Sequence, residues 1–520
     1  MAISLGRVFD AIRAVVPPGD AALIHGDHVT SWRDFHRRTD ALAASFLAGG
    51  AVAGDKVALL LRNGPAYAEV TVAALKARLV HVNINYRYIG EELFYILDNS
   101  DAVVLVHDAE FAPLVAPLAH RLPRLTQIIE VGAAFEAAAT GDAVLPPQDH
   151  DPDDLLFIYT GGTTGSPKGV MWAQGDLWLL MGGGAPIGES PLTGIDVLLA
   201  NIAAGVGRQR SLVLPPQMHG TGFLTTLSTL ARGGCVVTLP GGFEPHAALA
   251  ACAAHSPDYA VVVGDAFARP LLAALDAGAG SIASLATILS SGTMWSPEVK
   301  AGLLRHNERL VLLDALSSSE SLGIGVSMTS AATAGAATRF TAGPETIVVD
   351  DGLRPLGPGE TGRLARGGLN PVGYYKDAAK SAATFPTIDG KRYSVAGDWA
   401  TVEADGSITL LGRGSHCINT GGEKVFPEEV EEALKTHPAV DDALVFGVAD
   451  AKWGQAVTAI VAGSAAGQSA AGEAEMIAHV RVHLAPYKAP KRIIWVREVP
   501  RAPNGKADYA AAKHLAAEMS

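Results

Sequence analysis

The chain has 520 residues, of which 48% are hydrophobic and 18% are charged, and its formal net charge is −13. This length predicts roughly three to four packing units, and the composition is that of a globular protein, which excludes general disorder. The negative charge argues against a nucleic-acid partner, because phosphate backbones require a basic surface.

The N-terminal segment is amphipathic, and Arg7 and Asp10 interrupt the apolar core that a signal peptide would need. No run reaches about 18 apolar residues, so we expect no integral membrane segment. Three widely spaced cysteines, Cys235, Cys252 and Cys417, predict neither a disulfide framework nor a zinc site. These features predict a cytoplasmic protein whose thiols lie in a reducing compartment.

Helical and strand signals alternate in about the first 150 residues and again from about 170 to 330. Apolar residues recur at helical spacing, and short apolar runs between them are typical of buried strands. This alternation predicts parallel sheets covered by helices. The predicted helices are 40–47 and 65–77, and the predicted strands are 57–61, 102–107, 211–214, 235–239, 259–263 and 310–313.

The pattern then changes twice. Between 330 and 412, Gly and Pro punctuate short alternating segments such as 407–411, which predicts a more antiparallel β region. After residue 412 a compact α+β pattern predicts a helix at 427–436, strands at 443–447 and 457–461, and a surface loop at 462–472. We therefore predict an α/β fold with a large N-terminal domain of several subdomains (1–412), a junction at 413–415 and a small α+β C-terminal domain (416–520).

Residues 159–170, YTGGTTGSPKGV, form a candidate phosphate loop after a strand predicted at 154–159. Glycines let the backbone approach an anion, hydroxyls and amides donate hydrogen bonds to it, and Lys168 adds a positive charge. The alternative for this composition alone is a mobile surface loop. The order Pro-Lys-Gly is not that of a Walker A loop, and the chain has no G-x-G-x-x-G between a strand and a helix.

This loop resembles the signature of the adenylate-forming superfamily, which includes acyl-CoA synthetases, luciferases and peptide-synthetase adenylation domains. Further motifs of that family follow in order over nearly the whole chain. They are LPPQMHG at 214–220, SSGTM at 290–294, DALSSSE at 314–320, Gly397-Asp398, Gly412-Arg413, GGEK at 421–424 and PNGK at 503–506. The number and order of these matches make the resemblance specific.

The resemblance implies a two-step reaction that uses ATP, Mg²⁺ and CoA. A carboxylate attacks the α-phosphate of ATP and releases pyrophosphate, and the CoA thiol then attacks the acyl-adenylate and releases AMP. Lys506 would pair with the carboxylate and the α-phosphate, Glu320 with Thr163 would hold Mg²⁺, and His219 would line the acyl site. Without the resemblance, Lys506 reads as a surface lysine and His219 as a core histidine.

The resemblance also implies the binding residues. The expected ATP and AMP contacts are Thr160, Gly161, Gly162, Thr163, Thr164, Gly165, Ser166, Lys168, Ser291, Gly292, Thr293, Asp314, Ala315, Leu316, Ser317, Ser319, Asp398 and Arg413. The expected CoA contacts are Gly421, Gly422 and Lys424. The expected acyl pocket is His219, Thr221, Gly222, Val263, Gly264, Phe267 and Ser290, with Leu316 and Ser317 beside it. The C-terminal domain would be mobile and would rotate about a hinge at Ser415 between the two steps.

Four positions depart from the family pattern. Leu316 replaces an aromatic that stacks on adenine, Ser319 replaces Thr, Ser415 replaces the usual hinge aspartate, and Lys424 stands where arginine is also common.

The segments DALSSSE, GRGSHCINTGGEKVFPEEVEEAL, GVMWAQ and VVGDAFARPLL resemble actinobacterial-type acyl-CoA synthetases, including ligases for steroid side-chain acids. This branch implies a bulky hydrophobic substrate, either a fatty acid or a sterol-derived acid. Small residues at Gly264, Ser290 and Ser317 would leave room for such an acyl group.

Three alternatives stay open. The chain could be an adenylation enzyme that loads a separate carrier protein; only 14 residues follow Lys506, so we expect no fused carrier domain. A luciferase-like oxidative enzyme is disfavoured by the branch resemblance. A non-enzymatic nucleotide-binding protein is disfavoured by intact Lys506, Glu320, Asp398 and Arg413. We expect small-molecule partners, no nucleic acid, and a homodimer as the candidate assembly, because dimers are common in the family.

Overall fold

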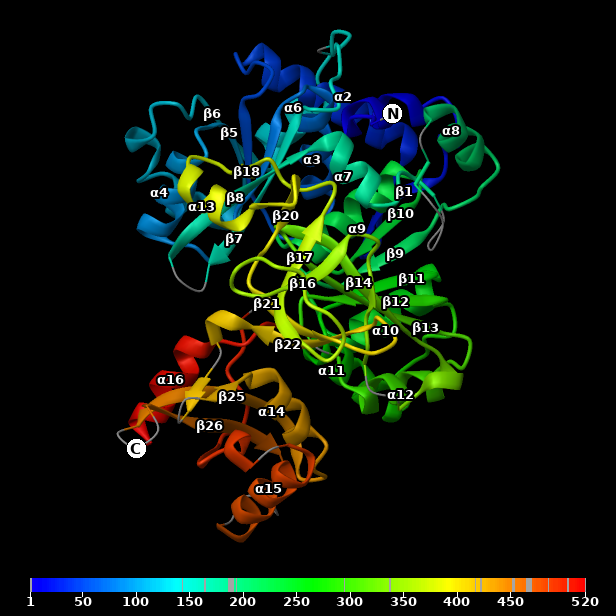
Figure 1. The fold of residues 1–520 in the computed structure, drawn as a ribbon. Helices are drawn as coiled ribbons and strands as arrows, with labels where there is room; N and C mark the ends of the chain where they lie inside the picture. Colours follow the sequence, from blue (N-terminus) through cyan, green and yellow to red (C-terminus); the bar gives the residue numbers. More distant parts are fainter. Residues whose placement is uncertain are drawn as a thin grey trace.

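A computed structural model describes residues 2–519, apart from 143, 163–164, 186–190, 193, 294, 336–337, 417, 421–422, 451–453, 464–469, 485 and 503–504. The backbone alone is described at 161, 162, 165, 166, 413, 415, 419, 423, 424, 454, 470 and 471. The described residues form four sheets, and the last of them belongs to a separate C-terminal lobe (Figure 1).

The first lobe contains a seven-stranded sheet in the order β18-β8-β7-β4-β3-β5-β6. Its strands are β3 (Lys56–Leu60), β4 (Val80–Asn83), β5 (Ala102–Asp108), β6 (Gln127–Val131), β7 (Leu155–Gly162), β8 (Gly165–Ala173) and β18 (Gly373–Tyr374). Strands β3 to β7 pair in parallel, while β8 pairs antiparallel with both β7 and β18.

Helices cover this sheet, as the alternation predicts for buried parallel strands. They include α2 (Trp32–Ala48), α3 (Pro65–Lys76), α4 (Gly90–Asn99), α5 (Ala112–Val115), α6 (Ala133–Thr140) and α7 (Gln174–Leu180). The helix predicted at 40–47 is the second half of α2, which begins at Trp32 because the Ser31 hydroxyl caps it by accepting from the Asp34 amide.

The second lobe is a nine-stranded sheet in the order β15-β14-β13-β12-β11-β9-β10-β1-β2. Its strands are β1 (Ala21–His25), β2 (His28–Ser31), β9 (Arg210–Val213), β10 (Cys235–Thr238), β11 (Tyr259–Val262), β12 (Thr287–Ser291), β13 (Val311–Ser318), β14 (Ser321–Thr329) and β15 (Thr341–Ala342). Its helices are α1 (Leu5–Ile12), α8 (Ile195–Ala203), α9 (Gly220–Ala231), α10 (Pro245–His255), α11 (Asp265–Asp276) and α12 (Pro297–His306). The strands predicted in both lobes are confirmed to within one or two residues, except that β7 extends three residues and β13 five residues further.

A third sheet is antiparallel throughout, which confirms the antiparallel β region predicted between residues 330 and 412. It has the order β19-β20-β17-β21-β22, and β16 pairs with β17. Its strands are β16 (Thr346–Val349), β17 (Thr361–Gly367), β19 (Thr387–Ile388), β20 (Lys391–Ser394), β21 (Asp398–Val402) and β22 (Ile408–Arg413). Helix α13 (Ala378–Thr384), which precedes β19, packs against β18 of the seven-stranded sheet.

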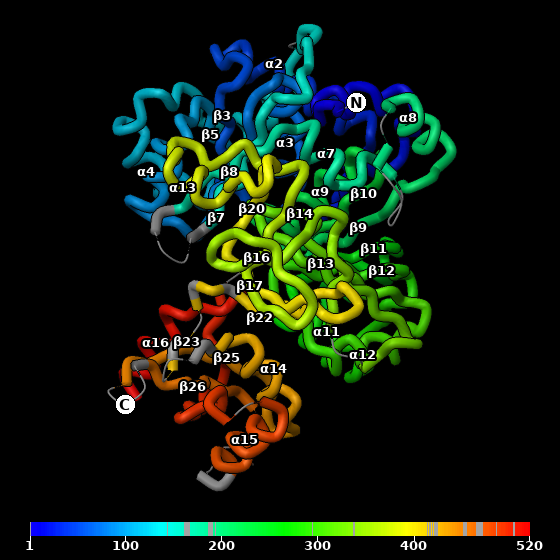
Figure 2. The backbone as a smooth tube through the Cα atoms, in the orientation of Figure 1, coloured from blue at the N-terminus to red at the C-terminus, as the bar shows by residue number. Residues whose placement is uncertain are grey.

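The C-terminal lobe follows at once. Strand β22 ends at Arg413, a short 3-10 turn covers Gly414–His416, and β23 already belongs to the fourth sheet, β24-β23-β26-β25 with β27 on β26. Figure 2 shows this orange-to-red lobe below the others. Its elements are β23 (Ile418–Thr420), β24 (Glu423–Val425), α14 (Pro427–Lys435), β25 (Val440–Asp450), β26 (Gly454–Gly463), α15 (Ala470–His483), β27 (Arg492–Trp495) and α16 (Tyr509–Glu518).

The remaining predictions concern a loop, the cysteines and the membrane. The loop predicted at 462–472 is shortened by β26 and α15, and its centre lies outside the described residues. Cys235 and Cys252 are buried and free, and burial raises the pKa of each thiol to about 11, whereas Cys417 is not described. Among the described helices, none is long and apolar enough to cross a bilayer.

Candidate active site

The carboxyl ends of β11, β12 and β13 lie side by side and bring two of the sequence motifs together. Ser290 pairs with Asp314 and Ser291 with Ala315 in the parallel register. The Ser291 hydroxyl donates to the Ala315 carbonyl over 2.9 Å, and the Gly264 amide donates to Ser290 Oγ over 2.9 Å. Carboxyl ends of parallel strands are where α/β sheets bind ligands. Segments 290–294 and 314–320 are therefore neighbours at such an edge.

The candidate phosphate loop is largely a β-hairpin. Strands β7 and β8 continue pairing through Thr160–Lys168 and Gly162–Gly165. The prediction of a loop over all of 159–170 is therefore wrong, because the described residues on both sides of 163–164 belong to paired strands. Residues 163–164 themselves lie outside the described part of the chain. Glycines at the end of the hairpin allow such a tight approach of two strands.

Lys168 and Glu320 both contact Tyr374, and Lys168 also pairs with Asp377. Sequence reasoning singled out neither Tyr374 nor Asp377. Lys168 Nζ lies 3.1 Å from Asp377 Oδ2 and 5.5 Å from the ring centre of Tyr374. The Tyr374 hydroxyl donates to Glu320 Oε1 over 3.0 Å. The Lys380 amide and the Lys168 ammonium lower the pKa of Asp377.

Strand β18 explains this arrangement, because it pairs with β8 and places Tyr374 opposite Val170, beside the turn that holds Glu320. The only sequence signal is the aromatic, charged run GYYKD at 373–377, and no spacing connects it to residue 168.

Glu320 fits the family's magnesium ion. Mg²⁺ is usually bound by one or two carboxylates together with substrate phosphates, not by an all-protein cage. Glu320 provides a carboxylate in the turn between β13 and β14, and the Tyr374 hydroxyl orients it toward the phosphate hairpin. Within the described residues, no group of three or more His, Cys, Asp or Glu side chains is arranged to hold a metal.

Asp398 and Arg413 are direct cross-strand partners in the antiparallel pair β21–β22. The Gly414 amide donates to the Gly397 carbonyl over 3.0 Å, and Gly397 has φ of 101°. A positive φ of this size favours glycine. The predicted ribose-binding aspartate and the hinge arginine are therefore adjacent, although the side chain of Arg413 is not described.

Lys506 reaches the strand ends from the C-terminal lobe. A Cβ placed on Gly292 would lie 3.6 Å from Lys506 Cε, 3.7 Å from Val263 Cγ1 and 3.9 Å from Thr221 Oγ1. Gly292 also has φ of 98°, so a side chain there would be both strained and in contact with the lysine. The structure thus brings the predicted catalytic lysine to the end of β12, near two predicted acyl-site residues, Thr221 and Val263.

His219 lies at the N-terminal end of α9, close to this lysine. Burial, the charge of Lys506 and the charge of Arg87 lower the pKa of His219 to about 4. Its imidazole is therefore neutral at pH 7, and it can donate or accept a hydrogen bond without adding a third positive charge.

The small residues predicted to leave room for an acyl chain also make internal contacts, and their place in the acyl pocket stays a prediction. Ser290 is fully buried and accepts from the Gly264 amide, and Ser317 Oγ accepts from the Gly323 amide over 3.3 Å. A Cβ on Gly222 would lie 2.6 Å from the Pro216 carbonyl oxygen, so this glycine allows close helix packing. Val263 and Phe267 are buried at 4% and 5% exposure.

Two predicted nucleotide contacts also pack internally. Asp314 forms a buried ion pair with Lys300, and burial raises the pKa of this carboxyl to about 6 against the effect of the lysine. Leu316 packs in an apolar cluster with Ile324 and Phe340. Contacts of Asp314 and Leu316 with a nucleotide stay predictions, as do those of Ala315, Thr293 and Ser319.

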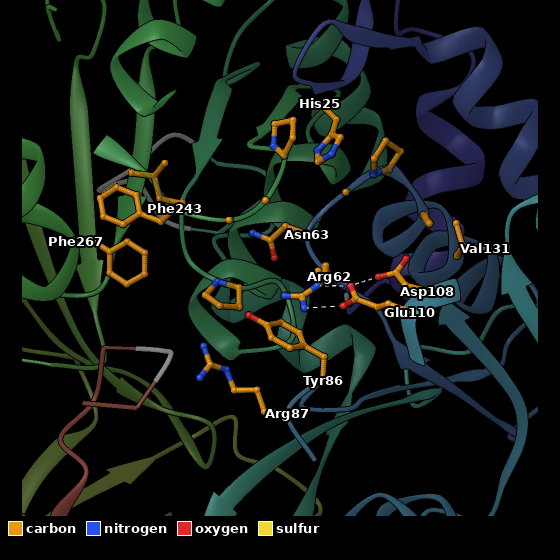
Figure 3. Close-up of a pocket in the computed structure, with 18 of the residues that line it drawn as sticks. His25, Arg62, Asn63, Tyr86, Arg87, Asp108, Glu110, Val131, Phe243 and Phe267 are labelled. Atoms are coloured by element: carbon orange, nitrogen blue, oxygen red, sulfur yellow. Dashed lines mark hydrogen bonds and ion pairs between the residues drawn. The ribbon is translucent and has the colours of Figure 1, made fainter. Parts of the chain in front are cut away.

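A groove of about 1520 Å³ opens beside the strand ends, between the two large sheets and the C-terminal lobe. Figure 3 shows Arg62, Tyr86 and Arg87 on one side of it and Phe243 and Phe267 on the other. Arg62 pairs with Glu110, and its guanidinium lies 4.8 Å from the ring centre of Tyr86. Phe267 was predicted as an acyl-pocket residue, whereas Arg62, Tyr86, Arg87, Glu110 and Phe243 are far apart in the chain and carry no motif, so sequence reasoning missed them.

Several predicted positions lie outside the described part of the structure. Thr163, Thr164, Gly421 and Gly422 are not among the described residues, and the structure describes only the backbone of Gly161, Gly162, Gly165, Ser166, Arg413, Ser415 and Lys424. The backbone of Ser415 lies in the 3-10 turn Gly414–His416, and that of Lys424 lies in β24.

Comparisons with known proteins agree over almost the whole chain. The AMP-binding enzyme family matches residues 11–375, and the AMP-binding enzyme C-terminal domain matches residues 429–506. The medium-chain acyl-CoA ligase Mig of Mycobacterium avium is 39% identical and covers 99% of this chain and 98% of its own. A 3-oxocholest-4-en-26-oate–CoA ligase of Rhodococcus rhodochrous is 37% identical and covers 99% of this chain and 96% of its own.

Solved structures show the same fold. The anthranilate CoA ligase AuaEII, in complex with anthranoyl-AMP, has a TM-score of 0.85 at 21% identity and covers 99% of this chain and 98% of its own. ATP-bound MatB from Rhodopseudomonas palustris has a TM-score of 0.83 at 22% identity, with 99% and 100% covered.

Proposed function

Because the chain belongs to the AMP-binding enzyme family, we propose that it is an ATP-dependent acyl-CoA synthetase for a hydrophobic carboxylic acid. In the first step the substrate carboxylate attacks the α-phosphorus of ATP, an acyl–O–P bond forms, and pyrophosphate leaves. In the second step the CoA sulfur attacks the acyl carbon, the acyl–O bond breaks, and AMP leaves. The thiol proton passes to solvent.

The observation that carries this proposal is the meeting of Lys506 with the strand ends at Gly292 and with His219. A lysine ammonium placed between a carboxylate and a phosphate neutralises charge that develops as the two anions approach. The neutral state of His219 leaves Lys506 and Arg87 as the cations at this point. The carboxylate and the phosphate would therefore meet Lys506 and Arg87 beside a neutral imidazole.

Lys168 and Glu320 serve the pyrophosphate side of the same step. Lys168 would exchange Asp377 for phosphate oxygens, since a side chain that is 34% exposed can reorient at low cost. Mg²⁺, held by Glu320 with Thr163, would neutralise the phosphates when bound. Asp398 offers two acceptor oxygens for the ribose hydroxyls, and Arg413 beside it would contact the ribose or the phosphates.

The substrate class is a fatty acid or a steroid side-chain acid. The named activities of the relatives, a medium-chain acyl-CoA ligase and ligases for medium- to long-chain fatty acids and 3-oxocholest-4-en-26-oate, support this choice. We further propose the domain division 1–412, 413–415 and 416–520, rotation at Ser415, and CoA contacts from Gly421, Gly422 and Lys424. A cytoplasmic location, where ATP and CoA are available, and a homodimer stay predictions.

Pyrophosphate release across a panel of acids, with and without CoA, tests the proposal. We expect acid-dependent pyrophosphate with medium- to long-chain and steroid side-chain acids, and a thioester only when CoA is added. No release with any acid would contradict the enzyme assignment. Release without thioester formation would instead favour the alternative of loading a carrier protein.

A further inference from the structure

The residue that holds the Lys506 turn in shape is Arg501. Its guanidinium forms a two-pronged pair with Asp442, with Nε 2.7 Å from Oδ2 and Nη2 2.6 Å from Oδ1. The third nitrogen, Nη1, donates to the Gly505 carbonyl over 3.2 Å. All three guanidinium nitrogens are therefore engaged, and one of them holds the peptide unit that joins Gly505 to Lys506.

Backbone bonds complete the turn. The Ala502 amide donates to the Lys506 carbonyl over 2.7 Å, and the Gly505 amide donates to the Ala502 carbonyl over 2.8 Å. Arg501 and Ala507 form an isolated antiparallel bridge at its base. Asp442, the anchor of the clamp, lies near the start of β25, beside an irregularity in the pairing of β25 with β26. The peptide unit before Lys506 is thus held to strand β25 through Arg501 and Asp442.

The tip of the turn docks on the first turn of α11 in the N-terminal domain. A Cβ on Gly505 would lie 2.7 Å from Ala266 Cβ, which is closer than real Cβ contacts come, and Gly505 has φ of 78°. Only glycine permits this approach without strain. The docking therefore involves the same glycine whose carbonyl accepts a hydrogen bond from Arg501.

An acidic residue of the N-terminal domain faces the clamp. Asp265, next to Ala266, lines the same groove as Arg501, Asp442 and Gly505. Burial opposes the charge of Asp265, but the charges of Lys435 and Arg269 lower its pKa. Burial likewise opposes the charge of Arg501, but its bonds to Asp442 and the charges of Glu431 and Asp265 raise its pKa. Cations of one domain therefore face a carboxylate of the other.

We propose that Arg501 is the positioning residue of Lys506: it clamps the 501–507 turn to Asp442 and presents the lysine to the strand ends only while Gly505 rests on Ala266. The inference rests on the proposed two-step reaction. Arg501 and Asp442 lie in the same domain and move together, whereas the contacts with Ala266 and Asp265 are lost when that domain rotates. Arg501 therefore serves the first step and not the second.

The test separates the two half-reactions in Arg501→Lys, Arg501→Ala and Asp442→Asn. Acid-dependent ATP–pyrophosphate exchange measures adenylation, and CoA attack on a synthetic acyl-adenylate measures the second step. A lysine keeps the charge but not the fork. Because small misplacements of a reacting group lower rates by on the order of a hundredfold, we expect exchange to fall by roughly ten- to a hundredfold, with kcat affected and KM for ATP nearly unchanged. Thioester formation should stay within about twofold.

Two controls exclude a general structural effect. Arg497→Ala removes an exposed arginine of the same segment and should leave both half-reactions unchanged. In a Lys506→Ala background, Arg501→Ala should add no further loss of exchange, because it acts through the lysine.

Equal losses in both half-reactions, an additive double variant, or normal exchange in Arg501→Lys and Asp442→Asn would each overturn the proposal. A wild-type protein without any exchange would instead contradict the proposed function itself.

Discussion

The phosphate hairpin and the Lys506 turn reach the same site but are held in opposite ways. The hairpin is part of a continuous sheet, in which β8 pairs with β7 on one side and β18 on the other. The Lys506 turn is fixed inside its own domain by Arg501, and it meets the N-terminal domain through Gly505 and facing charges. The backbone hydrogen bonds of the sheet keep the phosphate hairpin in place permanently. The contact of Gly505 with Ala266 and the facing charges can instead be broken and formed again.

The comparison predicts that removing the lysine harms one half-reaction only. Lys506→Ala should lower ATP–pyrophosphate exchange by on the order of a hundredfold or more, by analogy with loss of one donor to a developing charge. CoA attack on a synthetic acyl-adenylate should be spared. Lys513→Ala, an exposed lysine of α16 in the same domain, is the matched control. Equal damage to both steps would refute the division of labour.

Residues beside the phosphate hairpin should behave differently from Lys506, because they do not belong to the domain that rotates between the two steps. Tyr374→Phe removes the hydroxyl that orients Glu320, and we expect adenylation to fall about tenfold, since hydrogen bonds to charged groups contribute about 1.5–3 kcal/mol. The Mg²⁺ concentration for half-maximal exchange should rise. Tyr375→Phe, which removes a bond to Asp101 outside the site, should change neither value. An unchanged Mg²⁺ requirement in Tyr374→Phe would contradict the orienting role.

A substitution at the junction between the two regions should lower activity less than Lys506→Ala does, and it should act mainly on the second half-reaction. Ser415→Pro fixes φ and removes an amide donor in the 3-10 turn Gly414–His416. We expect thioesterification to fall roughly fivefold or more while adenylation changes little, because the rotation is needed between the steps. Stopped-flow measurement of each step would show this. A Ser415→Pro enzyme with normal overall turnover would place the pivot elsewhere.

The smallest expected effect is on stability and concerns His219, which lies where the two regions meet. Its folded pKa of about 4 is below the ordinary histidine value of about 6.5, so the unfolded chain binds more protons between these values and stability rises with pH there. His36 and His81 act in the same direction, and Asp314, with a pKa raised to about 6, acts in the opposite one.

We therefore expect the midpoint of thermal unfolding to rise by about 2–4 °C from pH 5 to pH 7. His219→Gln should reduce this rise, and an unchanged pH dependence in that variant would contradict the assignment of a neutral, buried imidazole.

The sequence by itself determined the fold class and most of the elements. Parallel strands buried on both faces read as apolar runs whatever their partners are, so segments such as 57–61, 102–107 and 235–239 were predicted within a residue or two. The family motifs identified Lys168, Glu320 and Lys506 as candidate site residues. The phosphate segment was misjudged as a loop because glycine-rich composition is shared by loops and tight hairpins, and only strand pairing distinguishes them.

Only the tertiary structure decided which residues serve those candidates. Tyr374 and Asp377 reach the site because β18 pairs with β8, and the Ser290 hydroxyl accepts from the Gly264 amide of the neighbouring strand end. Arg501 acquires its role from a strand, Asp442 in β25, that is distant in sequence. Such partners are set by pairing and docking between remote segments, and local composition carries no record of them.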